Sequence, residues 1–209
     1  MKEWEGDVNE GFTIWFTGLT GAGKTTIARL VAEELRRRGK KVELLDGDEV
    51  RKHLSDGLGF TKEDRDKNVL RIGYVCKLLS RNGIVAIGAA VSPYRETRER
   101  LRAELGDFVE VYVKCPLSVC QQRDHKGIYR DFKEGKISRV SGMDDPYEEP
   151  ESPDVVLDTA KTTPQECVSE VMRALEELGY VRPEMGEEGP YDEREKALVE
   201  KRLSDLGYI

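Results

Sequence analysis

Short apolar runs alternate with amphipathic stretches along most of the chain. Five such runs predict β-strands, at residues 12–17, 41–46, 84–90, 108–113 and 154–157. Between them, apolar residues recur every three or four positions, and this spacing predicts helices at about residues 23–39, 61–82, 94–105 and 163–178. The run at 84–90 contains no polar side chain, which is typical of a strand that is covered on both faces.

This alternation of strands and helices is typical of an α/β fold with right-handed crossovers. We therefore expect a five-stranded parallel sheet with helices on both of its faces. The polar segment 116–153 interrupts the pattern, and only one short helix is predicted within it. Because loops of that length are commonly functional, we expect about residues 124–150 to form a mobile lid.

The C-terminal part of the chain differs from the rest in composition. Residues 182–190 (RPEMGEEGP) have the glycine, proline and acidic content of a linker. The residues that follow form one amphipathic pattern with a narrow apolar stripe, made by Val199, Leu203 and Leu206. We therefore assign residues 1–181 to one domain and residues 182–209 to a linker and a C-terminal helix, which we expect to dock on the domain or on a partner.

Charge and composition narrow the possible classes of protein. The 209 residues include 34 Lys+Arg and 41 Asp+Glu, and the formal net charge of −7 argues against a partner such as nucleic acid. No run of about 18 apolar residues occurs, so we expect no membrane-spanning helix. The first residues lack the basic and apolar regions of a secretory signal. The four cysteines show no metal-binding spacing, which predicts buried thiols in a reducing, cytoplasmic setting.

Residues 18–25 (GLTGAGKT) match the phosphate-binding pattern G-x-x-x-x-G-K-[ST], between a predicted strand and a predicted helix. Glycines let backbone N–H groups curl around phosphate oxygens, and the positive end of the following helix adds to the attraction. Lys24 supplies a charge for the β- and γ-phosphates, and the Thr25 hydroxyl is a ligand for Mg²⁺. The pattern predicts binding of ATP and Mg²⁺ by Gly18, Leu19, Thr20, Gly21, Ala22, Gly23, Lys24, Thr25 and Thr26.

Other nucleotide-binding classes fit the sequence less well. The dinucleotide-binding pattern G-x-G-x-x-G is absent. Residues 61–64 (TKED) match the pattern [NT]-K-x-D that recognises guanine, but they open a predicted helix as a capping element, so we attribute the match to chance. The predicted strand at 84–90 ends without an acid, whereas Asp46 and Asp48 follow the strand at 41–46. This arrangement suits a kinase that acts on a small molecule.

Three further clusters follow the loop, at residues 46–68, 92–95 and 123–129. Together with the loop, and over about residues 11–178, they closely resemble the adenylylsulfate kinase family. The resemblance implies a P-loop kinase fold, a homodimer, and transfer of the γ-phosphoryl group of ATP to the 3′-hydroxyl of adenosine 5′-phosphosulfate, with Mg²⁺. The product, 3′-phosphoadenosine 5′-phosphosulfate, belongs to sulfate assimilation. A sulfate adenylyltransferase is therefore an expected partner.

Carried over residue by residue, the resemblance assigns acceptor binding to Asp48, Arg51, Phe60, Arg65, Asn68, Val91, Ser92 and Lys126. Arginine suits sulfate and phosphate oxygens because its guanidinium donates two parallel hydrogen bonds. Phe60 matches a residue that stacks on the acceptor adenine, and Arg123 in the lid is expected to stack on the base of ATP. Plainer interpretations stay open: Arg65 as a solvated helix charge, and Phe60 as packing under a loop.

The resemblance assigns catalysis to Lys24, Asp48, Ser92 and Lys126. Asp48 is the candidate base beside the acceptor hydroxyl, and Asp46 supports the metal ion together with Thr25. Closure of the lid would bring Lys126 to the transferring phosphoryl group. Ser92 has two interpretations, as a transient phosphoserine or as a group that only holds the acceptor. We favour the second, because direct in-line transfer is physically sufficient.

One position departs from the family's pattern. The family has a phenylalanine in the lid that stacks on the acceptor adenine, whereas this chain has Val140, and valine cannot stack. Two alternatives therefore stay open. Val140 favours a related kinase that acts on another nucleotide-like acceptor. A non-catalytic nucleotide sensor, or the kinase-like arm of a larger assembly, is the other alternative, although intact Lys24, Asp48 and Lys126 argue against it.

Overall fold

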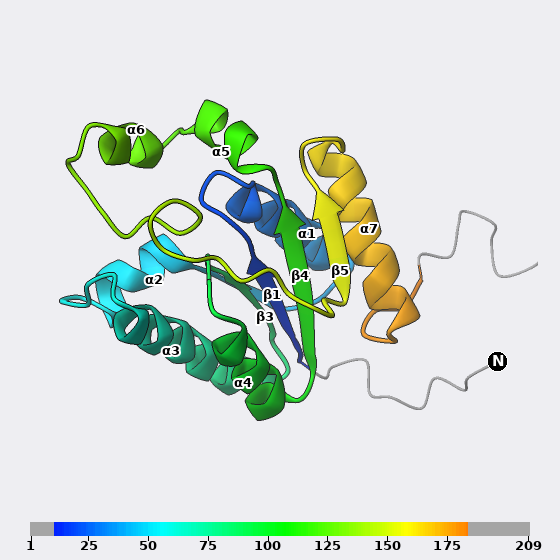
Figure 1. Ribbon diagram of the computed structural model, residues 1–209. Coiled ribbons are helices and arrows are strands. Elements are labelled where there is room, and N and C mark those ends of the chain that lie inside the picture. The colour runs from blue at the N-terminus through cyan, green and yellow to red at the C-terminus, as the bar shows by residue number, and fades with distance from the viewer. Residues whose placement is uncertain (1–10, 184–209) are drawn as a thin grey trace, which may run out of the picture.

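A parallel sheet lies at the centre of the computed structural model, which describes residues 11–183 (Figure 1). Its strands lie in the order β2-β3-β1-β4-β5. Their bounds are β1 (Thr13–Thr17), β2 (Val42–Asp46), β3 (Val85–Ala89), β4 (Phe108–Lys114) and β5 (Val155–Asp158). In the central register, Ile14 of β1 lies opposite Ile87 of β3 and Val109 of β4. The predicted five-stranded parallel sheet is confirmed.

Helices cover both faces of the sheet (Figure 1). On one face, α1 (Lys24–Arg37) packs beside α7 (Pro164–Glu177), and on the other, α3 (Lys62–Ser80) packs beside α4 (Arg95–Leu105). These four helices were predicted. The structure adds α2 (Gly47–Leu54), and it places two short helices, α5 (Leu117–Arg123) and α6 (Ile128–Lys133), in the segment where the sequence predicted one.

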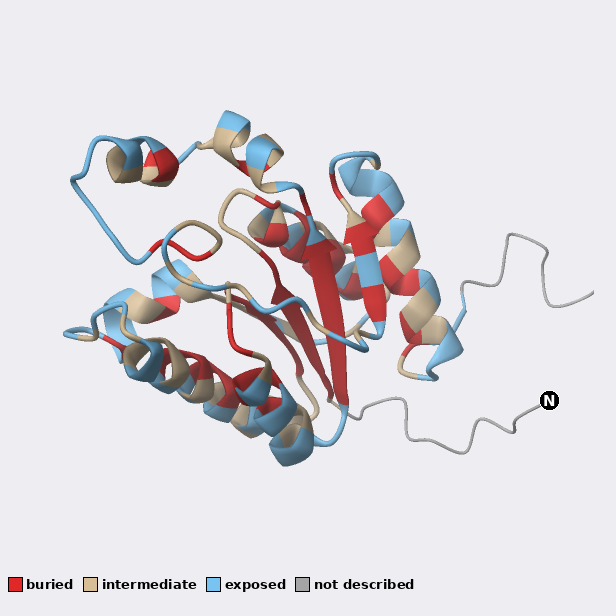
Figure 2. Cartoon of the chain, in the orientation of Figure 1, coloured by how far each residue is buried: buried red, intermediate tan, exposed pale blue. Residues whose placement is uncertain are grey.

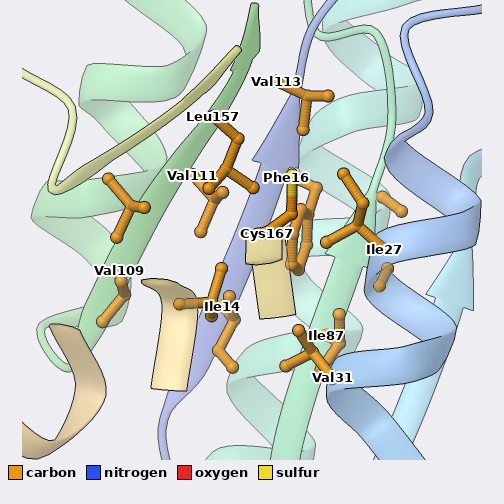
Figure 3. Close-up of a cluster of buried hydrophobic side chains, with 14 of the residues drawn as sticks. Ile14, Phe16, Ile27, Val31, Ile87, Val109, Val111, Val113, Leu157 and Cys167 are labelled. Carbon is orange, nitrogen blue, oxygen red and sulfur yellow. The ribbon is translucent and has the colours of Figure 1, made fainter. Parts of the chain in front are cut away.

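Side chains alternate between the two faces along β1, and this alternation builds two hydrophobic clusters. Ile14 and Phe16 face α1 and α7, where Figure 3 shows them among Ile27, Val31 and other buried residues. Trp15 belongs to the second cluster, beneath α3 and α4. Every residue of β1 is buried, and so is β4 up to its exposed last residue, Lys114 (Figure 2). Full burial of such a side chain contributes about 1.5–3 kcal/mol, so the central strands anchor the domain.

Local capping explains where several helices begin. Thr163 forms a capping box with Glu166, and proline occupies the first position of α7, as the sequence predicted. The Thr61 hydroxyl accepts a hydrogen bond from the Asp64 N–H at the start of α3, so the guanine-like match at residues 61–64 is a helix cap. β2 runs directly into α2 because Asp46 is both the last residue of the strand and the N-cap of the helix.

Residues 184–209 lie outside the described residues, and with them lie most of the predicted linker and the predicted C-terminal helix. The docking of that helix stays a prediction. Between residues 11 and 183, no helix combines the length and the apolar character needed to cross a membrane.

Candidate active site

The strands of a parallel sheet end at one common edge, and in α/β proteins ligands bind outside that edge. The phosphate-binding loop, residues 18–23, follows β1, and Asp46 ends β2. Residues 90–94 follow β3, and β4 leads into α5 and α6, which lie beyond this edge in Figure 1. The topology therefore gathers the predicted donor, acceptor and lid residues in one region.

Two glycines of the phosphate-binding loop adopt conformations that other residues avoid. Gly18 has a φ of 148°, and a Cβ there would lie 2.5 Å from the Val113 carbonyl oxygen of β4. Gly23 has a φ of 105° and is the N-cap of α1, which begins without a side-chain cap. The N–H groups of the first turn of α1 are thus left for an anion, and the helix dipole favours one there.

Lys24 is buried in the first turn of α1. Its Nζ donates to the carbonyl oxygens of Gly18 at 2.9 Å and of Leu19 at 2.8 Å. Burial lowers the pKa of Lys24 from 10.5 to about 8, and repulsion from Lys126 adds to this effect. A buried ammonium held by neutral carbonyl groups gains strongly from an incoming anion, because a phosphate supplies the opposite charge.

The remaining loop residues contact the surrounding elements. The Thr20 carbonyl accepts a hydrogen bond from the Tyr129 hydroxyl of α6 at 2.8 Å, and the Ala22 carbonyl accepts one from the Thr159 hydroxyl at 2.8 Å. A Cβ at Gly21 would approach the Cys120 carbonyl oxygen of α5 to 3.0 Å. Thr26 is exposed on α1. These contacts join the loop to the start of the lid and to the end of β5.

Thr25 and Asp46 bring a hydroxyl and a carboxylate together. Thr25 Oγ1 donates to Asp46 Oδ2 at 2.6 Å, and Asp46 Oδ1 accepts from the Asp48 N–H at 3.0 Å. Burial raises the pKa of Asp46, but these hydrogen bonds outweigh it, so the pKa lies below the usual value for aspartate. Mg²⁺ prefers oxygen donors and takes one or two protein ligands when it binds with phosphates. The pair therefore fits that ion.

An ion pair joins the lid to α2. Lys126, between α5 and α6, donates to Asp48 Oδ2 in the first turn of α2. The side chains of Lys126 and Asp48 are 57% and 67% exposed, so the pair contributes little to stability. Its position matters more, because Asp48 donates its backbone N–H to Asp46, which in turn accepts from Thr25. A continuous path of contacts thus links the phosphate-binding loop to the lid.

Phe60 lies close to two guanidinium groups. The Cζ of Arg51 lies 4.3 Å from the centre of the Phe60 ring, and that of Arg65 lies 5.4 Å from it. Arg51 donates to the carbonyls of Leu58 and Gly59, and Arg65 donates to that of Phe60. Phe60 is nevertheless 52% exposed. An exposed aromatic face beside two cations suits a planar ligand that carries negative charge.

Asn68 lies on α3, and Val91 follows β3. Asn68 is buried on α3, and its side-chain Oδ1 has no hydrogen-bond partner among the described residues. A buried amide oxygen without a partner is costly, which makes Asn68 a ready partner for a donor group of a ligand. Val91 is half-buried, and its carbonyl accepts a hydrogen bond from Thr17 Oγ1 at 2.8 Å.

The Ser92 hydroxyl is buried and hydrogen-bonded to other residues of the protein. Its Oγ accepts a hydrogen bond from the Trp15 indole N–H at 3.0 Å and lies 3.0 Å from Thr17 Oγ1. The residue is 1% exposed and has a φ of 40°, in the left-handed region that residues other than glycine rarely adopt. Such backbone strain persists only where the surrounding structure holds it.

Arg123 ends α5 and contacts Thr159, which follows β5. Its Nη1 and Nη2 donate to the hydroxyl and carbonyl oxygens of Thr159 at 3.2 Å and 2.6 Å. Because the Thr159 hydroxyl in turn donates to the Ala22 carbonyl, Arg123 lies one contact away from the phosphate-binding loop. Stacking of Arg123 on the base of ATP stays a prediction.

Val140 lies in the interior. It is 6% exposed and belongs to the hydrophobic cluster on the α1 and α7 side of the sheet. Its backbone N–H and that of Arg139 both donate to the Asp144 carboxylate, and the Arg139 carbonyl accepts a hydrogen bond from Arg65. The backbone around residue 139 therefore reaches the acceptor cluster, whereas the Val140 side chain fills the core.

Sequence reasoning missed a buried arginine at this edge. Arg98 of α4 is 2% exposed, and its Nε donates to Glu110 of β4 at 2.8 Å. The only signal was Glu110, a single acid within an otherwise apolar predicted strand. Tyr129, which fixes the lid to the phosphate-binding loop, was missed as well, because one tyrosine in a polar segment carries no pattern.

The family model described as adenylylsulphate kinase matches residues 10–158. This chain belongs to the adenylylsulphate kinase family. The matched residues include the phosphate-binding loop, the cluster around Phe60 and residues 124–150, which are the parts of the site described above. The likeness therefore covers the site as well as the sheet.

Individual members of the family are similar over most of the chain. The adenylyl-sulfate kinase of a Picosynechococcus strain is 51% identical over 175 residues, which are 84% of this chain and 99% of that protein. A probable bifunctional SAT/APS kinase of Sorangium cellulosum is 54% identical over 82% of this chain, but the match spans only 29% of that longer protein. The structure of the Mycobacterium tuberculosis APS kinase CysC in complex with AMPPNP and APS superimposes with a TM-score of 0.77 at 38% identity, covering 80% and 98% of the two chains.

Proposed function

We propose that this chain transfers the γ-phosphoryl group of ATP to the 3′-hydroxyl of adenosine 5′-phosphosulfate. One observation carries the proposal: contacts run from Thr25 through Asp46 and Asp48 to Lys126, and Asp48 shares helix α2 with Arg51 of the acceptor cluster around Phe60. Membership of the adenylylsulphate kinase family supports the identity of the acceptor. The loop is the donor half of the site, and the cluster is the acceptor half.

Each side chain then has a task. The N–H groups of the loop and the first turn of α1 bind the ATP phosphates, and Lys24 exchanges its carbonyl partners for phosphate oxygens. Arg51 and Arg65 bind the phosphosulfate, Phe60 stacks on the adenine, and Asn68 and the backbone at Val91 complete the acceptor pocket. Arg123 stacks on the base of ATP. Positioning and charge neutralisation supply most of the catalysis in such transfers.

Proton and charge handling fall to Asp48, Lys126 and the metal pair. Asp48 accepts the proton of the acceptor hydroxyl once Lys126 moves from Asp48 to the transferring phosphoryl group. Thr25 and Asp46 would hold Mg²⁺. When bound, the ion neutralises charge on the phosphate oxygens.

The proposal assigns Ser92 to positioning. Its hydroxyl is buried and already engaged with Trp15 and Thr17. Within residues 11–183, no hydrogen bond joins it to a histidine or a carboxylate that could act as an activating base. Attack on a phosphate would require the hydroxyl to leave this environment. Direct in-line transfer needs no such movement.

A coupled assay of ADP release tests the function. We expect turnover with adenosine 5′-phosphosulfate and Mg²⁺, little turnover with adenosine 5′-phosphate, and loss of turnover by orders of magnitude in Lys24→Ala with the fold intact. Lys161→Ala, an exposed lysine paired with Asp158, is the matched control and should behave as wild type. Turnover with another nucleotide-like acceptor, but none with adenosine 5′-phosphosulfate, would support the alternative kinase and contradict the proposal.

The assembly and location of the protein form a secondary part of the proposal. We infer a homodimer, a sulfate adenylyltransferase as the supplier of the acceptor, and a cytoplasmic location. The four cysteines are free, buried thiols, which supports a reducing compartment. Burial raises the pKa of Cys76 and of Cys120 to about 12, so neither thiol is reactive at neutral pH. Light scattering of the purified full chain would measure the oligomeric state.

A further inference from the structure

Arg98 is one of the most buried charged residues of the described chain. Its guanidinium makes three hydrogen bonds, from Nε to Glu110 at 2.8 Å, from Nη1 to the Ser92 carbonyl at 2.6 Å and from Nη2 to the Glu148 carbonyl at 2.7 Å. These partners come from three separate parts of the chain: a central strand, the loop after β3 and the segment that returns from the lid. A single planar group therefore ties the three together.

Stability alone does not account for this arrangement. Burying an ion pair costs desolvation that its attraction often fails to recover, and apolar replacements are often as stable. Burial raises the pKa of Glu110 above the usual value for glutamate, although Arg98 and Arg102 act in the opposite direction. The pair therefore calls for an explanation other than stability, and its contacts suggest one.

Both carbonyl groups that Arg98 holds belong to segments that meet at the acceptor half of the site. The Ser92 backbone is in the left-handed region, next to Val91. Glu148 is tied to the same loop twice more, because its N–H donates to the Pro93 carbonyl at 2.8 Å and its carboxylate accepts from the Arg95 N–H at 2.7 Å. Residues 147–149, which we name the return segment, are thus fixed against residues 91–95, which we name the acceptor loop.

We propose that Arg98 is a positioning residue for the acceptor: it holds the acceptor loop in its strained conformation and couples it to the return segment of the lid. This inference rests on the proposed function, because it concerns the acceptor of that reaction. Within the described residues, Arg98 makes no hydrogen bond to the phosphate-binding loop or to Lys24. Its influence should therefore fall on the acceptor and spare the nucleotide.

Arginine is required for this task by geometry. Its fork directs Nη1 and Nη2 to two carbonyls while Nε keeps the carboxylate. Lysine keeps the positive charge next to Glu110 but has a single nitrogen. Arg98→Lys therefore tests the loss of the two carbonyl hydrogen bonds while the charge is retained. Arg102 offers a matched control, because it also lies on α4 and approaches Glu110, at 3.6 Å. Its other partners are Asp154, at 2.6 Å, and the Phe108 carbonyl, at 3.4 Å, rather than the acceptor loop.

Steady-state kinetics of the full chain test the proposal, with the KM for each substrate and the melting temperature measured for every variant. We expect Arg98→Lys to raise the KM for adenosine 5′-phosphosulfate at least about ten-fold, from the loss of charge-assisted hydrogen bonds, and to leave the KM for ATP within about two-fold. Arg102→Lys should leave both KM values unchanged. Glu110→Gln should lower the melting temperature with little change in either KM, because Arg98 keeps its two carbonyl partners.

A second variant covers the case in which Arg98→Lys does not fold. Arg98→Gln combined with Glu110→Gln leaves no charge unpaired, and it should show the same selective rise in acceptor KM relative to Glu110→Gln alone. An unchanged acceptor KM in the Arg98 variants, or an equal rise in both KM values, would overturn the proposal. A wild-type protein that does not phosphorylate adenosine 5′-phosphosulfate would instead refute the proposed function, so the two failures are distinct.

Discussion

The low pKa of Lys24 predicts that ATP binding takes up protons at alkaline pH. With a pKa of about 8, Lys24 is about half protonated at pH 8 in the free protein. The bound triphosphate restores the pKa to its ordinary value or above, because it places negative charge beside Nζ. Binding should therefore take up about 0.1 proton at pH 7, about 0.5 at pH 8 and about 0.9 at pH 9. At pH 9 Lys24 must be protonated for ATP to bind, and this step should weaken the affinity for ATP about ten-fold, or about 1.4 kcal/mol.

Isothermal titration calorimetry with a non-hydrolysable ATP analogue measures the uptake directly. The apparent binding enthalpy at each pH is compared in two buffers that differ in their enthalpy of ionisation, and the difference gives the number of protons bound. Lys24→Arg is the control, because a guanidinium stays charged throughout and any remaining uptake belongs to the nucleotide. Equal uptake in wild type and Lys24→Arg at pH 8 and 9 would refute the reasoning.

The same pKa fixes how the stability of the free protein depends on pH. The folded-state pKa of Lys24 lies below its unfolded value of 10.5, so the unfolded chain binds more protons between about pH 8 and 10.5. The contribution of Lys24 to the free energy of unfolding therefore increases with pH across that window. Below pH 8, burial of the charged Lys24 destabilises the folded protein by roughly 3 kcal/mol. Lys24→Met should remove the penalty, stabilise the free protein at pH 7 and abolish nucleotide binding, as denaturant titration and calorimetry would show.

Three further substitutions and one truncation test other parts of the site. Phe60→Ala should weaken acceptor binding by about 1–3 kcal/mol with an unchanged KM for ATP; equal changes in both would place Phe60 outside the acceptor site. Ser92→Ala should retain substantial turnover, and label from γ-labelled ATP that chases from wild-type protein into product would contradict this. Val140→Phe should lower stability by about 1–3 kcal/mol through overpacking, and a tighter acceptor KM would show that the side chain reaches the adenine. Ending the chain after Pro183 should preserve ATP binding; insoluble protein would place the C-terminal helix in the core.

Features with strong local patterns could be predicted from the sequence. The five strands are apolar runs in the sequence. Thr163 and Glu166 form a capping box, which predicts the start of α7. The phosphate-binding loop needs glycine where the backbone is left-handed, so its pattern is specific. In contrast, α2 was missed because it buries only Val50 and begins without a loop after β2. A helix with a single buried residue leaves no apolar period to detect.

Features that depend on distant contacts could not be predicted. The resemblance placed Val140 at a stacking position, but packing against the core decides where its side chain lies. The role proposed for Arg98 depends on partners from three segments, and one of them, at Glu148, is 50 residues away in sequence. Likewise, the left-handed backbone of Ser92 follows from the surrounding hydrogen bonds, since serine has no intrinsic preference for it. The neighbouring sequence does not predict the position of Val140, the contacts of Arg98 or the backbone conformation of Ser92.

The absence of a loop between β2 and α2 has a consequence for how acceptor specificity can change. Asp46 ends the strand, caps the helix and accepts from Thr25, so α2 cannot rotate without disturbing the donor half of the site. In the described part of the chain, residues 55–61, which carry Phe60 between α2 and α3, make no hydrogen bond to Thr25. We therefore expect substitutions that change the acceptor to fall in residues 55–61, and we expect Asp46 to tolerate few substitutions. A kinase built in this way can change its acceptor while it keeps its ATP-binding site.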